Sequence, residues 1–198
     1  MNLPEPWLLE WSPLEGIAAV FGVVSVYLST RQNIWSWPTA IVNVGLYTIV
    51  FYQGRLYGQM GLQPIYLALS AYGWYQWLHG GAQRSELRVT RASPRLLATL
   101  AVLNLAAWIA LAAILRRTDA ALPWLDALLA TTSLVAQWMM TRKILENWVL
   151  WIAVDLVYVP MFISQGLYAT AMLYAAFLGL ALMGVVEWRR SITAPAAS

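Results

Sequence analysis

The chain has 198 residues, of which 61% are hydrophobic and only 11% are charged, with a formal net charge of +3. A soluble domain carries about 25% charged residues, so this composition excludes a soluble globular protein. The apolar runs are long and unbroken, which excludes a membrane β-barrel built from short alternating strands. The composition therefore predicts one all-helical integral membrane domain over residues 1–198, because helices satisfy their backbone groups within the segment.

Few residues are available for chemistry. The chain has no Cys and a single His, His79, at the end of an apolar run. This predicts no disulfide, no metal, no cofactor and no enzymatic centre. The N-terminal segment carries acidic residues where a signal peptide needs positive charge, and we expect its Trp7 and Trp11 to lie at the membrane interface.

Seven apolar runs are long enough to span a bilayer, which needs about 20 residues. Short loops separate them, except for a polar segment after residue 79 that carries four Arg. The predicted spans are 14–30, 34–53, 60–79, 96–115, 121–141, 146–164 and 167–188.

The distribution of positive charge supports this span count. With seven spans, nine Lys and Arg residues fall on one side of the membrane and three on the other. Because positive loops stay in the cytoplasm, the N-terminus is predicted outside and the C-terminus inside. The nine are Arg31, Arg84, Arg88, Arg91, Arg95, Arg142, Lys143, Arg189 and Arg190, and the three are Arg55, Arg116 and Arg117.

The chain repeats itself at an offset of 111 residues. Within the 48 positions 30–77, thirteen residues recur 111 positions later, among them Trp37 as Trp148 and Tyr47 as Tyr158. Internal repeats in a multi-span protein are typical of transporters, whose substrate site lies near mid-membrane between the repeats. Duplication in a purely structural membrane protein is the alternative.

The offset relates the first three spans to the last three. The fourth span restores the direction of the chain, so the two triplets run parallel. This predicts a 3+1+3 plan like that of SWEET transporters: repeat one at about 14–79, a linker helix at about 96–115, and repeat two at about 121–190. The linker helix is a candidate oligomer surface.

Two polar residues lie at nearly equal depth in the two repeats. Asp155 is in the span 146–164, and Asn43, at 43 + 111 = 154, aligns one position away from it. Ionisable groups inside spans are expensive and mostly functional. The alternative is a carboxylate paired inside the bundle, but no Lys or Arg lies in any predicted span. We therefore expect Asp155 and Asn43 to face a substrate cavity.

Other polar and aromatic side chains accompany them on these faces. For any one amide the alternative is an interhelical hydrogen bond, worth about 0.6–2 kcal/mol in membranes. That is the interpretation chosen for Asn104 in the linker helix. The further candidate site residues are Tyr47, Tyr158, Gln63, Tyr66, Tyr174 and Gln137.

A tryptophan pair precedes Asp155 on the same helical stripe. Trp148 and Trp151 are three residues apart, and Asp155 follows Trp151 at i+4. Two indoles beside a carboxylate predict a clamp for a flat cationic ring, with Asn147 next to it. An interfacial aromatic belt is the alternative, above all for Trp148.

Four motifs in the chain resemble those of the PnuC family of bacterial vitamin transporters. They are NIWSWP at 33–38, LQPIY at 62–66, YGWYQW at 72–77 and ENWVLW at 146–151. The resemblance covers about residues 14–190. It implies a SWEET-like fold, a homotrimer in the inner membrane, and facilitated diffusion of nicotinamide riboside without ATP or obligatory ion coupling. Cytoplasmic phosphorylation on the route to NAD would trap the substrate.

The same resemblance implies site residues and alternatives. The family's aromatic clamp corresponds to Trp148 and Trp151, with Asn147 beside them, and its polar positions correspond to Asn43, Gln63 and Tyr66. Relatives carry thiamine or riboflavin. Thiamine is also a flat cation, whereas riboflavin is neutral and is disfavoured by an acid. A mononucleotide would need basic residues in the site, and the predicted spans contain none.

Overall fold

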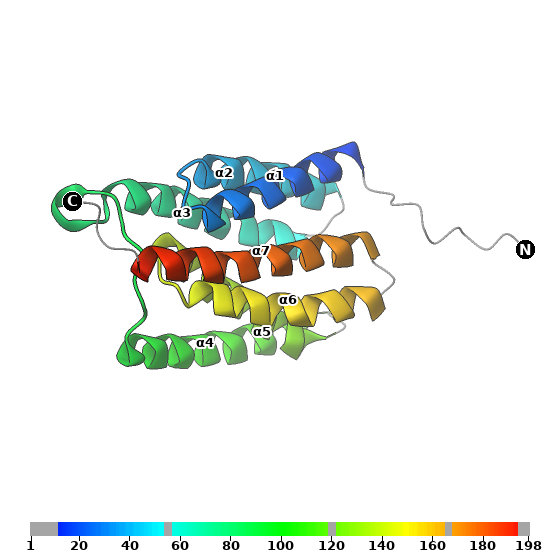
Figure 1. Ribbon diagram of the computed structural model, residues 1–198. Coiled ribbons are helices and arrows are strands. Elements are labelled where there is room, and N and C mark those ends of the chain that lie inside the picture. The colour runs from blue at the N-terminus through cyan, green and yellow to red at the C-terminus, as the bar shows by residue number, and fades with distance from the viewer. Residues whose placement is uncertain (1–11, 54–56, 119–121, 165–167, 194–198) are drawn as a thin grey trace, which may run out of the picture.

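A computed structural model describes residues 12–53, 57–118, 122–164 and 168–193. Over these residues the chain forms seven α-helices and one 3₁₀ turn, η1 (Ala82–Arg84), with no extended sheet. The helices lie side by side as a bundle (Figure 1). They are α1 (Pro13–Thr30), α2 (Ser36–Gln53), α3 (Tyr57–His79), α4 (Pro94–Leu115), α5 (Pro123–Thr141), α6 (Asn147–Ser164) and α7 (Tyr168–Thr193).

The predicted spans and the helices correspond one to one. Six agree within three residues at both ends, and α7 continues five residues beyond the predicted end at 188. Local capping explains two starts: Ser12 and Glu15 form a reciprocal capping box before α1, and the Ser93 hydroxyl caps α4. Three residues named in the sequence interpretation lie outside the described residues: Trp7, Trp11 and Arg55.

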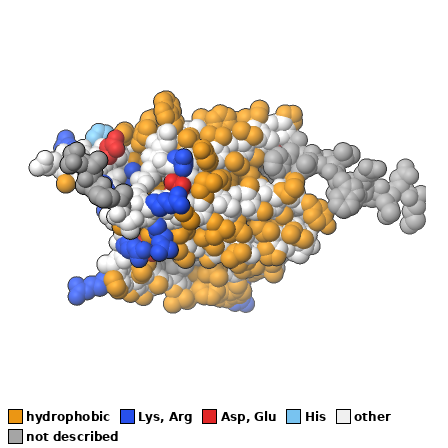
Figure 2. Space-filling model, in the orientation of Figure 1, with side chains coloured by type: hydrophobic (Ala, Val, Ile, Leu, Met, Phe, Trp, Pro, Cys, Tyr) orange, Lys and Arg blue, Asp and Glu red, His pale blue; other side chains and the backbone are white. Residues whose placement is uncertain are grey.

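The outer surface of the bundle is apolar. Residues of α4 such as Val102 and Ile114 are more than 60% exposed, and hydrophobic side chains cover the visible middle of the molecule (Figure 2). By length and hydropathy alone, α1, α4, α6 and α7 can each cross a bilayer. The helices α2, α3 and α5 carry more Tyr, Gln, Ser and Thr, so they are less apolar than the sequence interpretation assumed. The all-helical membrane class is confirmed.

Helix packing follows a regular pattern. Helix α1 packs against α2 and α7, α5 packs against α6 and α3, α2 packs against α3, and α6 packs against α7. Exchanging α1 with α5, α2 with α6 and α3 with α7 leaves this list unchanged. Helix α4 packs against α5, and it is the helix that this exchange leaves without a counterpart.

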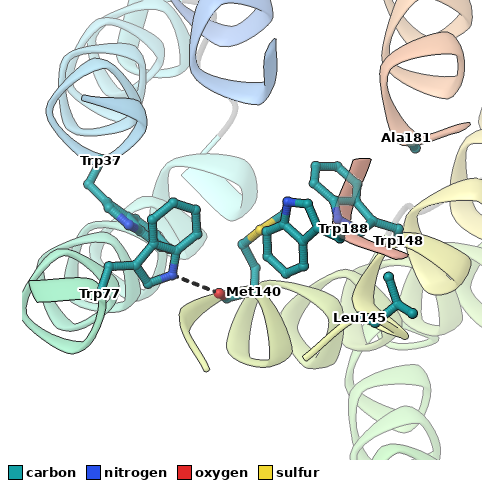
Figure 3. Packing of buried hydrophobic residues seen from close by; sticks show 7 residues of the cluster. All are labelled: Trp37, Trp77, Met140, Leu145, Trp148, Ala181 and Trp188. Carbon is teal, nitrogen blue, oxygen red and sulfur yellow. Dashed lines mark hydrogen bonds between the residues drawn. The ribbon is translucent and has the colours of Figure 1, made fainter. Parts of the chain in front are cut away.

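Four tryptophans form the buried centre at one end of the bundle (Figure 3). Trp37 and Trp77 meet edge to face with ring centroids 5.2 Å apart, and Trp148 and Trp188 do the same at 5.4 Å. These two pairs are related by the offset of 111 residues. All four side chains are at most 2% exposed, and we call them the tryptophan cluster.

Two hydrogen bonds tie the cluster across the bundle. The Trp77 indole donates to the carbonyl oxygen of Met140 at 3.1 Å, and the Trp188 indole donates to that of Ser29 at 3.0 Å. Since 29 + 111 = 140, donors and acceptors are again related by the offset. Each indole therefore adds a second donor to a carbonyl in the last turn of a helix, which also accepts from a backbone N–H of the following turn.

The segment 80–93, which we call the strap, lies over this end of the bundle on the side of the turn between α5 and α6. Leu87 and Val89 pack on the tryptophan cluster. Thr90 forms a parallel bridge with Ile144, and the Ala92 N–H donates to a Glu146 carboxylate oxygen at 2.8 Å. The strap therefore closes the cluster over the turn between α5 and α6.

Candidate substrate-binding site

One face of α6 points into the bundle and carries most of the candidate residues. Trp148, Trp151, Asp155 and Tyr158 follow at spacings of three and four, which places them on one side of a helix. Trp148 is 1% and Asp155 3% exposed, whereas Val149 and Leu156 on the opposite side are more than half exposed. Asp155 therefore faces the inside of the bundle, and a substrate cavity beside it stays a prediction.

A group of aromatic side chains lies around the C-terminal half of this face of α6. The rings of Tyr158 and Tyr174 lie 4.8 Å apart, Phe162 stacks on Tyr158 at 5.4 Å, and Phe177 meets Tyr174 at 5.8 Å. The sequence analysis did not include the two Phe residues. Their spacing could have indicated them, because Phe162 is one turn beyond Tyr158 and Phe177 is three residues beyond Tyr174.

The structure brings residues of both repeats to this aromatic group. Tyr47, Tyr66, Tyr158 and Asp155 all lie in the neighbourhood of the Tyr174 hydroxyl. Tyr47 and Tyr66 come from α2 and α3, and the other three residues from α6 and α7. The candidates Tyr47, Tyr66, Asp155, Tyr158 and Tyr174 therefore lie in one region between the two halves of the chain, and their role in binding a substrate stays a prediction.

Asp155 has no partner that would balance a negative charge. No ion pair or hydrogen bond joins it to another residue in the part of the chain that the structure describes. A buried carboxylate is costly unless it is paired. Asp126, in the first turn of α5, also interacts electrostatically with Tyr158. Asp126 therefore lies at the edge of this region.

The amides have more varied surroundings. The Asn43 amide donates to the Ala18 carbonyl oxygen at 2.7 Å, so it links α2 to α1 by the interhelical bond that the sequence interpretation disfavoured. The same kind of bond, expected for Asn104, is confirmed by its donation to the Thr132 hydroxyl at 3.2 Å. Gln137 is half-buried on α5.

Gln63 lines a groove between α2 and α3. The groove has a volume of about 350 Å³ and is almost entirely apolar. The half-buried amide is one of its few polar lining groups. The lining residues are Val44, Gly45, Thr48, Met60, Gln63, Pro64 and Leu67.

The two tryptophans expected to form a clamp do not flank an open space. Trp148 is packed edge-on against Trp188 within the tryptophan cluster, and Trp151 is half-buried against the same cluster. Gly184 allows this packing, because a Cβ at that position would overlap the Trp148 ring. A ligand can enter between the two indoles only if Trp148 leaves this position.

Unpaired polar atoms accumulate at the tryptophan level. The Asn147 side-chain oxygen and the Trp148 indole nitrogen are buried without a hydrogen-bond partner, and so are the Ser36 hydroxyl and the Trp37 indole nitrogen. Ser36 and Trp37 are the equivalents of Asn147 and Trp148 at the offset of 111. Buried polar groups are normally paired, so each repeat holds an unused acceptor and an unused donor here.

Curated relatives include transporters of two different vitamins. The chain is 28% identical over 209 residues to the nicotinamide riboside transporter PnuC of Escherichia coli (strain K12), covering 92% of this chain and 87% of that protein. It is 30% identical over 187 residues to the riboflavin/roseoflavin transporter RibM of Streptomyces davaonensis, covering 90% of this chain and 84% of that protein.

A solved structure and a family model agree with these relatives. The crystal structure of the vitamin B3 transporter PnuC superposes with a TM-score of 0.73 at 23% identity, covering 90% of this chain and 81% of that chain, which shows the same fold. The family described as nicotinamide mononucleotide transporter matches residues 12–190. The helices, the apolar surface and these matches show that this chain belongs to the PnuC family of membrane vitamin transporters.

Proposed function

We propose that this protein carries nicotinamide riboside across the bacterial inner membrane by facilitated diffusion. The observation that carries the proposal is Asp155, a buried carboxylate with no counter-ion among the described residues, near Tyr158 and Tyr174. A flat pyridinium ring supplies the missing positive charge and offers a face to the aromatic rings. Cytoplasmic phosphorylation then traps the substrate on its route to NAD.

The transport cycle that we propose uses two parallel repeats joined by α4. The packing pattern supports the 3+1+3 arrangement, because α1 to α3 make the same neighbour contacts as α5 to α7. All seven helices cross the membrane, with the N-terminus periplasmic and the C-terminus cytoplasmic. The gathering of Lys and Arg at the end of the bundle where α7 ends supports this orientation (Figure 2). Three copies assemble into a homotrimer.

The residues act at two levels in this scheme. Asp155 balances the ring charge, and Tyr47, Tyr66, Tyr158 and Tyr174 surround the substrate in the state described here. When the tryptophan cluster opens, Trp148 and Trp151 flank the ring. The atoms that lack partners on Asn147 and Trp148 then bind polar substituents. Among the remaining candidates, Asn43, Gln63 and Gln137 contact sugar hydroxyls as the repeats move.

Two other vitamins are the competing substrates. Riboflavin is favoured by the relationship to the Streptomyces protein, but its ring is neutral and leaves the Asp155 charge unbalanced. Thiamine is a cation and satisfies Asp155 as well as nicotinamide riboside does. A mononucleotide is disfavoured, because the Lys and Arg residues within the seven helices lie only at helix ends: Arg95 in the first turn of α4, and Arg189 and Arg190 near the end of α7.

Uptake into liposomes that contain only this protein tests the mechanism. Labelled nicotinamide riboside should equilibrate across the membrane, saturate with concentration and exchange with unlabelled substrate in either direction. Collapsing the proton gradient should not change the rate. Accumulation above the external concentration, in the absence of any kinase, would contradict facilitated diffusion.

A further inference from the structure

A polar cavity opens at the arginine-rich end of the bundle, between the end of α1 and the last turns of α7. Its volume is about 540 Å³, and every side chain that lines it is polar or charged. It is separate from the tyrosines and from Asp155, so the proposed transport site does not use it. The lining residues are Thr30, Arg31, Gln32, Glu187, Arg190 and Ser191.

The cavity has more positive than negative charge. Arg31 and Arg190 both pair with Glu187, at 3.3 Å and 3.8 Å, so one carboxylate serves two guanidinium groups. The two Arg side chains are 52% and 74% exposed. A guanidinium group has five N–H donors, so most of the donors in this cavity have no protein acceptor and remain available to an anion.

At the equivalent place in the other repeat, the guanidinium group has protein acceptors. Arg142, the equivalent of Arg31, donates to the Tyr72 hydroxyl at 2.9 Å and to the Gln76 amide oxygen at 3.3 Å. Gln76 stands where the cavity has Glu187. The same guanidinium is thus satisfied by neutral acceptors in one repeat and only by a shared carboxylate in the other.

Backbone groups show the same difference between the two places. In the turn between α5 and α6, the Leu145 N–H donates to the Thr90 carbonyl oxygen of the strap. Its equivalent in the turn between α1 and α2 is Ile34, whose N–H has no hydrogen-bond partner among the described residues. The strap thus covers one turn, and no described segment makes the equivalent hydrogen bond to the turn beside the cavity.

We propose that this cavity binds the phosphate group of an anionic phospholipid headgroup. The cavity lies at the ends of two apolar helices, which is the level of the headgroups when those helices span the bilayer. Guanidinium groups bind phosphate oxygens through paired, charge-assisted hydrogen bonds. Basic pockets between transmembrane helices are suited to anionic headgroups. The bound lipid would cover the junction of α1 and α7, as the strap covers the turn between α5 and α6.

Thermal unfolding and native mass spectrometry of the full chain in neutral detergent test this proposal. The probes are phosphatidylglycerol, phosphatidylcholine and inorganic phosphate. Phosphatidylglycerol should remain bound and raise the unfolding midpoint, whereas phosphatidylcholine should do neither. The double variant Arg31→Gln/Arg190→Gln should lose the shift, and Arg142→Gln, the control at the equivalent position, should keep it.

A second variant separates binding from folding. Glu187→Gln removes the competing carboxylate and should strengthen phosphatidylglycerol binding about fivefold, which is the effect of one elementary charge near a membrane surface. A purely structural ion pair predicts lower stability and no gain in binding. An equal shift with inorganic phosphate would overturn the lipid assignment, and an equal shift in the Arg31→Gln/Arg190→Gln variant would overturn the site.

Discussion

The indoles of Trp77 and Trp188 lie 6.0 Å apart between ring centroids and are inclined by 61°. Since 77 + 111 = 188, each residue contacts its own equivalent in the other repeat. Such a contact lies where the two repeats meet, and both indoles donate a hydrogen bond across it, to Met140 and to Ser29. The arginine-rich end of the bundle is therefore closed by the same interaction made twice.

This relationship predicts that the two indole donors contribute equally to stability. Trp77→Phe and Trp188→Phe keep an aromatic ring but remove the indole hydrogen bond, and each carbonyl keeps only its backbone donor. Each should lower the free energy of unfolding by about 0.5–1.5 kcal/mol. Thermal unfolding in detergent measures the effect, with the 65% exposed Trp35→Phe as control. A loss confined to one of the two variants would show that the halves are not equivalent.

The glycines beneath the tryptophans should be as sensitive. A Cβ at Gly73 would overlap the Trp37 ring, and one at Gly184 would overlap the Trp148 ring. Gly73→Ala and Gly184→Ala should each cost about 1–3 kcal/mol, because the indole must shift in a filled core. Gly179→Ala on the same helix as Gly184 meets no atom within 4 Å. It should be neutral or stabilising, and equal losses at all three positions would contradict this packing.

Lys143 should make stability depend on alkaline pH. The side chain is 6% exposed, and its ammonium lies 4.5 Å from the Trp77 ring centroid. Burial lowers the pKa of Lys143, opposed by the nearby Glu86 carboxylate. Because the folded pKa lies below the unfolded value of about 10.4, the folded state binds fewer protons in that interval. The free energy of unfolding should therefore gain a rising contribution as pH increases through it.

Lys143→Met tests that contribution, because it keeps the aliphatic packing and removes the charge. Unfolding midpoints of the variant and of the natural chain should be compared between neutral pH and the ordinary lysine range. The unfolding midpoint of the natural chain, relative to that of Lys143→Met, should rise as pH increases. A constant difference would mean that Lys143 has the same pKa in the folded and unfolded chains.

Asp155 should determine the preference for charged substrates. Asp155→Asn preserves the shape of the side chain and removes the charge, so it should weaken binding of a cationic vitamin by about 2 kcal/mol, which is more than tenfold. Binding of neutral riboflavin should change far less. Asp126→Asn is the matched control at the edge of the site. Equal losses for cationic and neutral vitamins would contradict charge recognition.

The sequence predicted the helices well because hydropathy and charge act locally. Span boundaries depend on runs of apolar residues, and the inward face of α6 follows from the spacing of Trp148, Trp151, Asp155 and Tyr158. Both properties can be read from neighbouring letters. The lower hydropathy of α2, α3 and α5 is local in the same way, since residues such as Tyr and Gln lower the hydropathy of α3.

The contacts of individual side chains could not be predicted in this way. The pattern places Trp148 on a face, but its partner Trp188 and the space at Gly184 come from a helix more than 30 residues later. Asn43 donates to a backbone carbonyl of α1, and any residue type at position 18 offers that acceptor. The strap was expected only as a polar loop, because the bridge between Thr90 and Ile144 depends on the fold.

Titration calorimetry of the purified protein with nicotinamide riboside, thiamine and riboflavin tests the central claim most directly. The natural chain and a Trp151→Ala variant should be titrated in parallel. Our account predicts that nicotinamide riboside binds more tightly than riboflavin and that the variant loses this binding. Tighter binding of riboflavin, or unchanged binding of nicotinamide riboside in the variant, would contradict the account.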